Sequence, residues 1–339
     1  MINFDLSNKA SSELISEFMH IHDISYQEHP RQAQNISQCF LSRSGVAFRY
    51  GVPVPISYYP TGSSIKLTVR ALGSIFFGGD VKPLSPSSTY VSALNPYSNG
   101  YYHWLTETLP AYCYYNDNIR SDCRFLIAGD TQLTDLQIET LEHAGIKNIE
   151  IIPHRSFKKF QNLTLLSHRT YGSFSKKEIE NLRKKYTSKS HISNEFVYVS
   201  RADAATRKIA NEECLITELK KLNFSNVTLS DMKFKDQKEL FQRTKILVSI
   251  HGAGLSNILM MPPGSTVIEI FPHPNQNKSL RYASLGRHYK LSGLFYSLAK
   301  ASGVNYLCIV SEPFSGFDNS EYTINIERLM NLIESCRGY

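Results

Sequence analysis

Apolar and polar positions alternate most regularly in the second half of the chain. Short apolar runs there predict buried strands at 196–200, 226–229, 245–250 and 266–271. Apolar residues spaced three and four apart predict helices at 211–222, 234–244, 255–261 and 323–335. Strands joined by helices are typical of a parallel sheet, so we expect a doubly wound α/β unit in this half.

The first half of the chain has a less regular pattern. Strand-like runs separated by Gly and Pro lie at 46–50, 63–70 and 74–77, which favours a β-rich start. Further strands are predicted at 90–94, 124–128 and 149–152. Helices that begin near His103 and span 135–144 alternate with these later strands, so a second parallel sheet is expected.

Length and composition narrow the class of protein. The chain has 339 residues, which suits two domains, and 42% hydrophobic residues exclude a disordered chain. We find no signal-peptide pattern and no apolar run long enough to span a bilayer, so the sequence predicts a cytoplasmic protein. Six Cys without a CxxC pair predict reduced thiols that are mostly buried.

Positive charge is concentrated between Arg155 and Lys189, where ten Lys or Arg face two Glu. The whole chain carries +7, so the rest of it is close to neutral. The segment is interpreted either as a solvated, partly helical connector or as a surface for anions such as membrane headgroups or an acidic polysaccharide. No nucleic-acid-binding motif accompanies it, so we expect no nucleic-acid partner.

A Gly-rich turn follows the strand predicted at 245–250. It reads His251-Gly252-Ala253-Gly254-Leu255, and Asn257 follows within the first helical turn. Ligands of open α/β sheets bind where strands end, and the N–H groups that begin a helix suit a phosphate. The glycines let a ligand approach the backbone, and His251 can donate to a phosphate or sugar oxygen. The alternative is a turn that serves packing alone.

Three cations follow the strand predicted at 196–200. Arg201 comes at its end, and Arg207 and Lys208 lie in the loop before the next helix. Forked guanidinium groups and an ammonium group suit a pyrophosphate. The alternative for Arg201 is a surface ion pair.

Three polar residues near these turns allow two interpretations each. Asn211 and Glu212 begin the helix at 211–222, where they either bind a ligand or favour the helix start. Glu269 lies inside an apolar strand, where a carboxylate is costly unless it has partners. We interpret Glu269 as an acceptor for ribose or sugar hydroxyls, or as half of a buried ion pair.

The helix that begins near His103 carries a candidate general base. His103 and Glu107 are four residues apart, so they share one face of a helix. A neighbouring carboxylate makes an imidazole more basic, as a general base requires. The alternative is a structural pair at the helix start. The chain has no Asp-x-Asp, HExxH or P-loop motif, which argues against a bound metal and against hydrolases and kinases.

Together these segments resemble glycosyltransferase family 61, which includes capsular polysaccharide biosynthesis proteins. The resemblance covers about residues 90–275 and rests on linked stretches at 99–110, 198–201, 207, 211–212, 250–257 and 263–272. It implies a GT-B-like α/β fold, with two Rossmann-like doubly wound domains facing a cleft. It also implies an inverting, metal-independent transfer from a nucleotide sugar.

The resemblance further implies domain limits and residue roles. Residues 1–185 would form the acceptor-side domain, 186–320 the nucleotide-sugar domain, and 321–339 a helix that packs back on the first domain. His103 or Glu107 would take the acceptor proton, and the sequence leaves open which does so. The implied donor-binding residues are Arg201, Arg207, Lys208, Asn211, Glu212, His251, Gly252, Ala253, Gly254, Leu255, Asn257 and Glu269.

We expect a bacterial, cytoplasmic member of the family that is peripheral at the inner membrane and acts in capsule or other surface polysaccharide synthesis. Its partners would be a nucleotide-sugar donor, a glycan or lipid-linked glycan acceptor, and an anionic membrane contacted through Arg155–Lys189. No cofactor or metal is expected. Two alternatives remain, namely a phosphosugar or pyruvyl transferase on the same scaffold, and a non-catalytic glycan-binding assembly protein.

Overall fold

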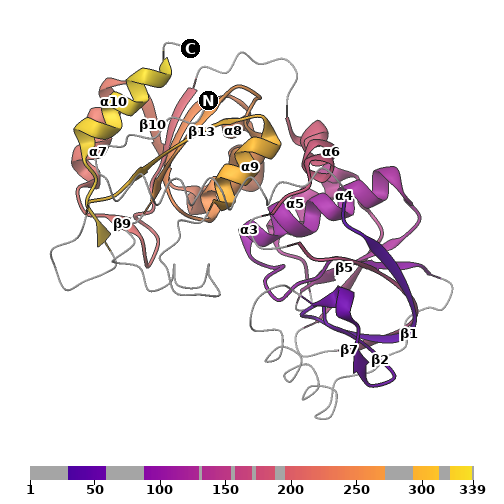
Figure 1. The fold of residues 1–339 in the computed structure, drawn as a ribbon. Coiled ribbons are helices and arrows are strands. Elements are labelled where there is room, and N and C mark those ends of the chain that lie inside the picture. The colour runs from indigo at the N-terminus through magenta and orange to yellow at the C-terminus, as the bar shows by residue number, and fades with distance from the viewer. Residues whose placement is uncertain are drawn as a thin grey trace. The chain divides into compact units, whose positions relative to one another are not determined.

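In a computed structural model, the chain divides into two compact units, which we describe separately (Figure 1). One comprises residues 26–186 and the other includes residues 187–339. The structure describes residues 30–58, 88–129, 132–153, 157–169, 173–187, 195–271, 293–312 and 321–337. The strands predicted at 63–70 and 74–77 lie outside the described residues.

The N-terminal unit is built on a seven-stranded sheet in the order β3-β2-β1-β7-β4-β5-β6. Its strands are β1 (Ala33–Ser42), β2 (Ala47–Arg49), β3 (Val52–Pro53), β4 (Tyr90–Ser92), β5 (Arg124–Ala128), β6 (Ile149–Ile152) and β7 (Phe157–Leu166). The strands β7, β4, β5 and β6 run parallel, as the alternation after residue 90 predicts. The strands β1, β2 and β3 add an antiparallel half. The sheet is therefore mixed: its parallel part agrees with the parallel sheet expected after residue 90, and its antiparallel strands differ from the doubly wound, Rossmann-like domain that the resemblance implies.

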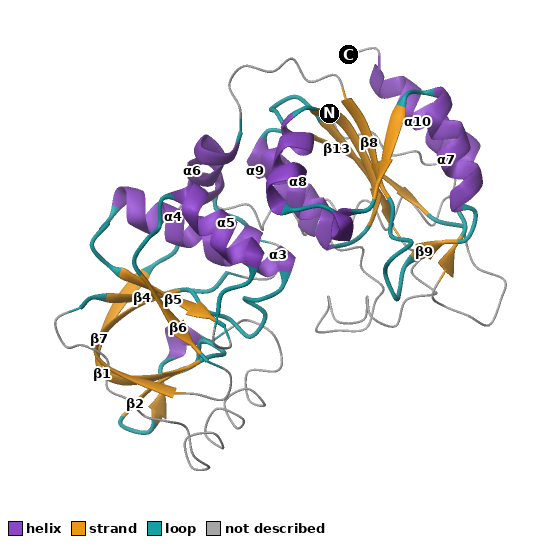
Figure 2. Ribbon diagram, turned by 180° about the vertical axis from the view of Figure 1, so that it is seen from behind, coloured by secondary structure: helices purple, strands orange, loops and turns teal. Residues whose placement is uncertain are grey.

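Three helices lie together on one side of this sheet (Figure 2), namely α4 (Leu109–Asn118), α5 (Asp135–Ala144) and α6 (Lys176–Tyr186). The bounds of α5 match the prediction because both of its ends are fixed locally. Thr134 and Gln137 form a reciprocal capping box at the start, and Gly145 ends the helix with a left-handed φ of 74°.

The basic segment does not form the solvated connector that was one interpretation of it. It contains β7, which pairs with β1 and β4, and α6, which packs against α4. The side chain of Arg183 is buried, and this burial lowers its pKa to about 10. Lys185 pairs with Asp117 at 3.0 Å between Nζ and Oδ2. Part of the positive charge of this segment is thus buried or paired within the unit, and the anion-binding surface stays a prediction.

The C-terminal unit is built on a five-stranded parallel sheet in the order β10-β8-β11-β12-β13. The strands are β8 (Glu195–Val199), β10 (Phe224–Val227), β11 (Thr244–Ile250), β12 (Thr266–Phe271) and β13 (Asn305–Val310). In chain order this is 2-1-3-4-5, a doubly wound arrangement whose direction of winding reverses between β8 and β11. The four predicted strands are confirmed, with β10 shifted by two residues, and the fifth strand was not predicted.

Helices cover both faces of this sheet, as Figure 1 shows. The helices α7 (Glu212–Lys221) and α10 (Ile326–Arg337) lie on one face, and α8 (Phe234–Gln242) and α9 (Leu294–Ser302) lie on the other. The segment predicted as a helix at 255–261 is a 3-10 helix, η4 (Ala253–Met260). A small parallel pair, β9 (Lys208–Ile209) and β14 (Glu321–Tyr322), completes the unit. None of the described helices is both long and apolar enough to cross a membrane.

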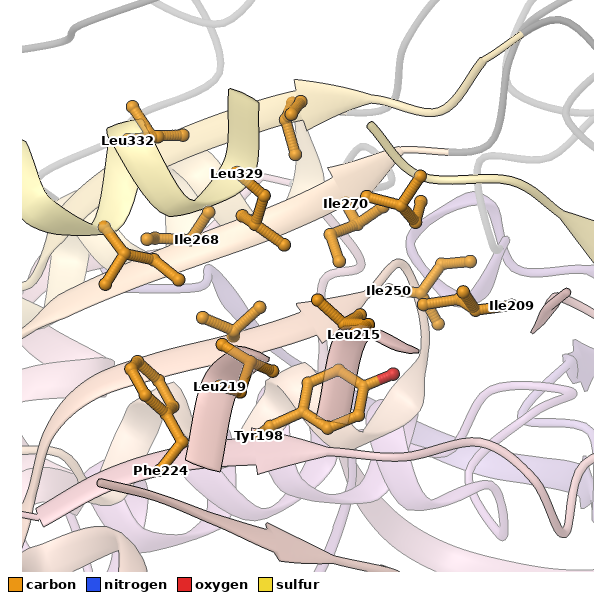
Figure 3. Packing of buried hydrophobic residues seen from close by; sticks show 14 of the residues in the cluster. Tyr198, Ile209, Leu215, Leu219, Phe224, Ile250, Ile268, Ile270, Leu329 and Leu332 are labelled. Atoms are coloured by element: carbon orange, nitrogen blue, oxygen red, sulfur yellow. The ribbon is translucent and has the colours of Figure 1, made fainter. Parts of the chain in front are cut away.

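The last helix belongs to the core of the C-terminal unit. Leu329 and Leu332 of α10 pack with Leu215 and Leu219 of α7 against the apolar face of the parallel strands (Figure 3). Burying this stripe is the driving force that places α10 here. The helix α10 is thus part of the C-terminal core, and the expected contact of residues 321–339 with the N-terminal domain stays a prediction.

The cysteines agree with the prediction of reduced, mostly buried thiols. All six lie within the described residues and are free. Four of them are buried, namely Cys39, Cys113, Cys123 and Cys308. Burial raises the pKa of Cys39 to about 11, so this thiol is unreactive near neutral pH.

Candidate functional site

Two of the predicted site segments meet where the C-terminal sheet reverses its direction of winding. Arg201 follows β8, and His251 follows β11, and these strands are parallel neighbours with Val199 opposite Ser249. Side chains after the carboxyl ends of two such strands lie at the same edge of the sheet. This edge is where open α/β sheets bind their ligands.

Gly252 lies directly against the Arg201 side chain. A Cβ atom built on Gly252 would collide with Nη1 of the Arg201 guanidinium. The backbone of Gly252 is extended, with φ 174°, so the glycine serves close approach and not an unusual conformation. The Gly-rich turn thus seats an arginine side chain over the start of η4.

The two arginines at this edge form a cationic pair. Arg207 donates from Nη1 to the backbone oxygen of His251 at 2.7 Å. Burial and the nearby charge of Arg207 lower the pKa of Arg201, and Asp203 opposes this effect. Among the described residues, the Arg201 side chain has no hydrogen bond or ion pair, and its Nε is buried. Two guanidinium groups held together in this way are suited to an anion with more than one negative charge.

Glu269 supports His251 and cannot reach a ligand. It is fully buried, one of its oxygens contacts Nδ1 of His251, and the other accepts from the Tyr306 hydroxyl at 2.5 Å. The rings of Phe271 and Phe295 enclose the imidazole. The interpretation of Glu269 as an acceptor for ribose or sugar hydroxyls is therefore wrong, because both of its oxygens are engaged inside the protein.

Other predicted donor residues have structural partners. Both ends of the Asn211 amide bond the backbone of Ile324, and Glu212 accepts from the Tyr198 hydroxyl at 2.6 Å. The buried Asn257 donates to Gly254 within η4. These contacts fix the elements around the turn.

The remaining predicted residues differ in their access to a ligand. Leu255 is fully buried, Gly254 packs against Leu229 of the adjacent 3-10 turn, and Ala253 is exposed. Lys208 lies in β9 opposite Glu321, and no described contact joins it to the arginine pair. The structure thus brings together Arg201, Arg207, His251 and Gly252.

In the N-terminal unit, the predicted His103–Glu107 pair forms. Nδ1 of His103 lies 2.9 Å from Oε2 of Glu107, and the Asn95 side chain donates to the same oxygen at 3.0 Å. The Asn95 amide is oriented by the Tyr97 N–H, which donates to its Oδ1 at 2.8 Å. The amide nitrogen can only donate, so we assign Oε2 as a carboxylate acceptor and place the imidazole proton on Nδ1. Nε2 is then the basic nitrogen of His103.

The helix carrying this pair is not a regular α-helix. A π-helical turn (Trp104–Thr108) lies between α3 (Tyr101–His103) and α4, and Pro110 follows with no N–H to donate to the preceding turn. Arg31 satisfies a backbone oxygen of the wide turn by donating from Nη2 to Glu107 O at 2.8 Å. Such turns are frequent at functional sites, and here the turn contains the glutamate of the pair.

Aromatic rings surround His103. The ring of Tyr97 stacks on the imidazole at 5.0 Å between centroids, and the ring of Tyr102 meets it edge-on at 4.9 Å. These contacts and the Glu107 hydrogen bond fix the plane of the imidazole. Sequence reasoning missed Asn95 and Arg31, because no spacing links them to His103.

Gly45 is expected to be essential for the loop that holds Asn95. It has φ +83°, and a Cβ atom there would collide with the backbone oxygen of Leu94. We expect Gly45→Ala to lower the free energy of unfolding by about 2–4 kcal/mol, since strain and overpacking add. Urea unfolding of the full chain measures this change.

The matched control is Gly51→Ala. Gly51 has a similar φ of +79° but open space around it, so only the backbone strain of about 1–2 kcal/mol should appear. Equal losses in the two variants would contradict the role assigned to the Gly45–Leu94 approach.

Comparison with known proteins covers candidate residues of both units. Residues 101–268 match the family model of glycosyltransferase 61. The EGF domain-specific O-linked N-acetylglucosamine transferase of Canis lupus familiaris is 34% identical over 89 residues, which are 24% of this chain and 17% of that protein. The protein O-linked-mannose beta-1,4-N-acetylglucosaminyltransferase 2 of Mus musculus is 40% identical over 70 residues, which are 20% of this chain and 12% of that protein. The matches thus span less than a fifth of these relatives.

Proposed function

Because residues 101–268 of the chain carry a glycosyltransferase 61 domain, we propose that this protein transfers a sugar from a nucleotide-sugar donor to an acceptor hydroxyl. The C-terminal unit binds the donor, and the N-terminal unit supplies the base. The observation that carries the proposal is the pair of guanidinium groups at the His251–Gly252 turn, where the sheet reverses its winding.

Charge supports a diphosphate as the group bound at this turn. A nucleotide sugar carries two phosphate charges, and its departure leaves a diphosphate that must be stabilised. Arg201 and Arg207 supply two positive charges, and the N–H groups of residues 252–254 precede the first backbone bond of η4, donated by Leu255. We propose that these groups take the part that a metal has in other glycosyltransferases.

The hydrogen bonds of His103 support its role as a base, and we propose a mechanism with one displacement. With its proton on Nδ1 and Glu107 as the acceptor, His103 takes the acceptor hydroxyl proton at Nε2. The oxygen then attacks the anomeric carbon opposite the leaving diphosphate, so the anomeric configuration inverts. Glu107 stabilises the imidazolium that forms, and Asn95 keeps the carboxylate in place.

The names of the two relatives suggest the sugar to test first. Both names specify an N-acetylglucosamine transferase, so we propose N-acetylglucosamine as the first donor sugar. As acceptor we propose a glycan or lipid-linked glycan hydroxyl, in the assembly of capsule or another surface polysaccharide. Acceptors linked to a protein form the second class, because one relative's name specifies EGF domains and the other specifies protein O-linked mannose.

A thermal-shift screen against nucleotides and nucleotide sugars, with and without EDTA, tests the proposal. A ligand that binds only the folded protein at about 100 times its Kd stabilises it by about 2.7 kcal/mol, which is measurable. We expect a nucleotide sugar to raise the melting temperature equally with and without EDTA. A rise that EDTA abolishes would contradict the metal-free mechanism.

No rise with any nucleotide would favour a non-catalytic glycan-binding protein. A different outcome is that the protein binds a nucleotide sugar without consuming it and transfers a phosphosugar or a pyruvyl group. That result would favour a phosphosugar or pyruvyl transferase on the same scaffold. Nucleoside diphosphate release in the presence of acceptor separates these outcomes.

A further inference from the structure

Within the part of the chain that the structure describes, the carboxylate of Glu269 is buried without a Lys or Arg beside it. Its exposed fraction is 0%, and its partners are the imidazole of His251 and the hydroxyl of Tyr306. No Lys or Arg of the described ranges lies within ion-pair distance of it. A buried carboxylate without a compensating charge is costly, so the proton shared with His251 decides whether this site is neutral.

The direction of each hydrogen bond follows from Tyr306. Burial and the charge of Glu269 raise the pKa of this phenol well above its usual value, so the hydroxyl keeps its proton and donates to Oε2. Oε1 therefore faces Nδ1 of His251, and the proton between them lies on one of these two atoms. A second proton on Nε2 would make the pair an imidazolium and a carboxylate, which together are neutral.

Two positively charged side chains lie near His251. Arg207 bonds its backbone oxygen, and Arg201 lies against the next residue, Gly252. Cys308 on β13 is a further titratable group near Glu269, and burial raises its pKa so that it stays a neutral thiol. From α9 and β12, His251 meets only the rings of Phe295 and Phe271. None of the described residues pairs with Nε2, which lies across the ring from Glu269.

We propose that Tyr306 and Glu269 hold His251 as an imidazolium toward the donor diphosphate, so that donor binding takes up one proton. This inference rests on the proposed function and adds a third cation to the arginine pair. Glu269 and Tyr306 are positioning residues, because they act through His251. Nε2–H donates to a phosphate oxygen only when the His251–Glu269 pair holds the second proton, whereas with a single proton on Nδ1 the ring presents a lone pair at Nε2.

The proposal fixes the sign of the pH dependence. Affinity for the donor is highest where the ring is protonated and falls as pH rises. Once the ring of the free protein is neutral, each pH unit weakens binding about ten-fold, because one proton must be taken up. The donor itself does not titrate near neutral pH, since both of its phosphates are diesters.

Isothermal titration of the full chain with UDP-N-acetylglucosamine, or with whichever nucleotide sugar the thermal screen finds, tests this. Titrations between pH 6 and 8.5, each in two buffers of different ionisation enthalpy, give the number of protons taken up. We expect the uptake on donor binding to rise with pH towards one proton. In Glu269→Gln, uptake should fall to near zero, and Kd at pH 6 should rise about ten-fold or more.

Tyr306→Phe keeps the Glu269 carboxylate and removes the hydroxyl that donates to it. The pH dependence of its donor affinity should therefore shift, and its melting temperature shows that it is folded. This variant decides the matter if Glu269→Gln does not fold. The matched control is Tyr296→Phe, a buried tyrosine of α9 that meets the Tyr306 ring but has no place in the proposed contacts. It should keep the wild-type profile.

Two results would overturn the inference and leave the donor site standing. One is donor binding by the wild type without proton uptake, and the other is unchanged uptake in both Glu269→Gln and Tyr306→Phe. Failure of every nucleotide sugar to bind the wild type would instead contradict the proposed function, and the inference would fall with it.

Discussion

His103→Ala is expected to lower kcat by about 10²–10⁴-fold, the usual contribution of a positioned general base. The affinity for the nucleotide sugar should stay unchanged, because His103 lies in the unit that is not proposed to bind the donor. Loss of Nε2 leaves the acceptor hydroxyl without a proton acceptor, while Glu107 keeps its hydrogen bond from Asn95. Steady-state rates of nucleoside diphosphate release, with donor affinity by titration, measure both effects.

A second variant tests which residue of the His103–Glu107 pair is the base. Glu107→Gln removes the charge that stabilises the imidazolium, so kcat should fall while the fold persists. The matched control is His143→Gln, since His143 lies on α5 and bonds the backbone oxygen of Lys185. Near wild-type turnover of His103→Ala would contradict its role, and if Glu107→Gln alone were inactive, Glu107 would be the base.

Arg201→Ala should raise the Kd of the nucleotide sugar by about 10–100-fold, since a hydrogen bond to a charged group contributes about 1.5–3 kcal/mol. The fold should tolerate the change, because the Arg201 side chain has no hydrogen bond or ion pair within the described residues. Arg201→Lys should recover part of the affinity, as it keeps the charge and loses the fork. Titration calorimetry measures the three dissociation constants.

The control for this series is Arg243→Ala. Arg243 belongs to the same unit but pairs with Glu195 at the surface, with 2.7 Å between Nε and Oε1. Its donor affinity should equal that of the wild type. Equal affinities of Arg201→Ala and the wild type would show that the donor site is misplaced.

The sequence predicts the C-terminal sheet well because its strands are continuous apolar runs separated by helical spacings. It fails at β1 and β7, which pair along nine residues at the centre of the N-terminal sheet. The strand β7 carries Lys158 and Lys159. These charged residues interrupt the apolar pattern that predicts a strand, so the sequence favours a connector for this segment. Such a pairing depends on contacts between distant segments, and no local pattern specifies it.

The candidate site is likewise predictable from the sequence only in part. Arg201 and His251 are predictable because each follows a buried strand, and Gly252 signals a close approach of another group. The role of Glu269 is not predictable from its strand, because it depends on Tyr306 of β13, which the sequence does not predict. Likewise, Asn95 meets Glu107 only through the turn that the folded chain forms. Motifs thus locate the candidate groups, and tertiary packing decides which of them can reach a ligand.

The central claim is that the turn after β11 binds the diphosphate of a nucleotide sugar. A crystal structure of the full chain with the nucleotide sugar found in the thermal screen tests it most directly. The account predicts diphosphate oxygens within hydrogen-bond distance of the Arg201 and Arg207 guanidinium groups and of the backbone N–H groups at Gly252 and Ala253. A diphosphate bound elsewhere, with Arg201 and Arg207 making no contact to it, would contradict the account.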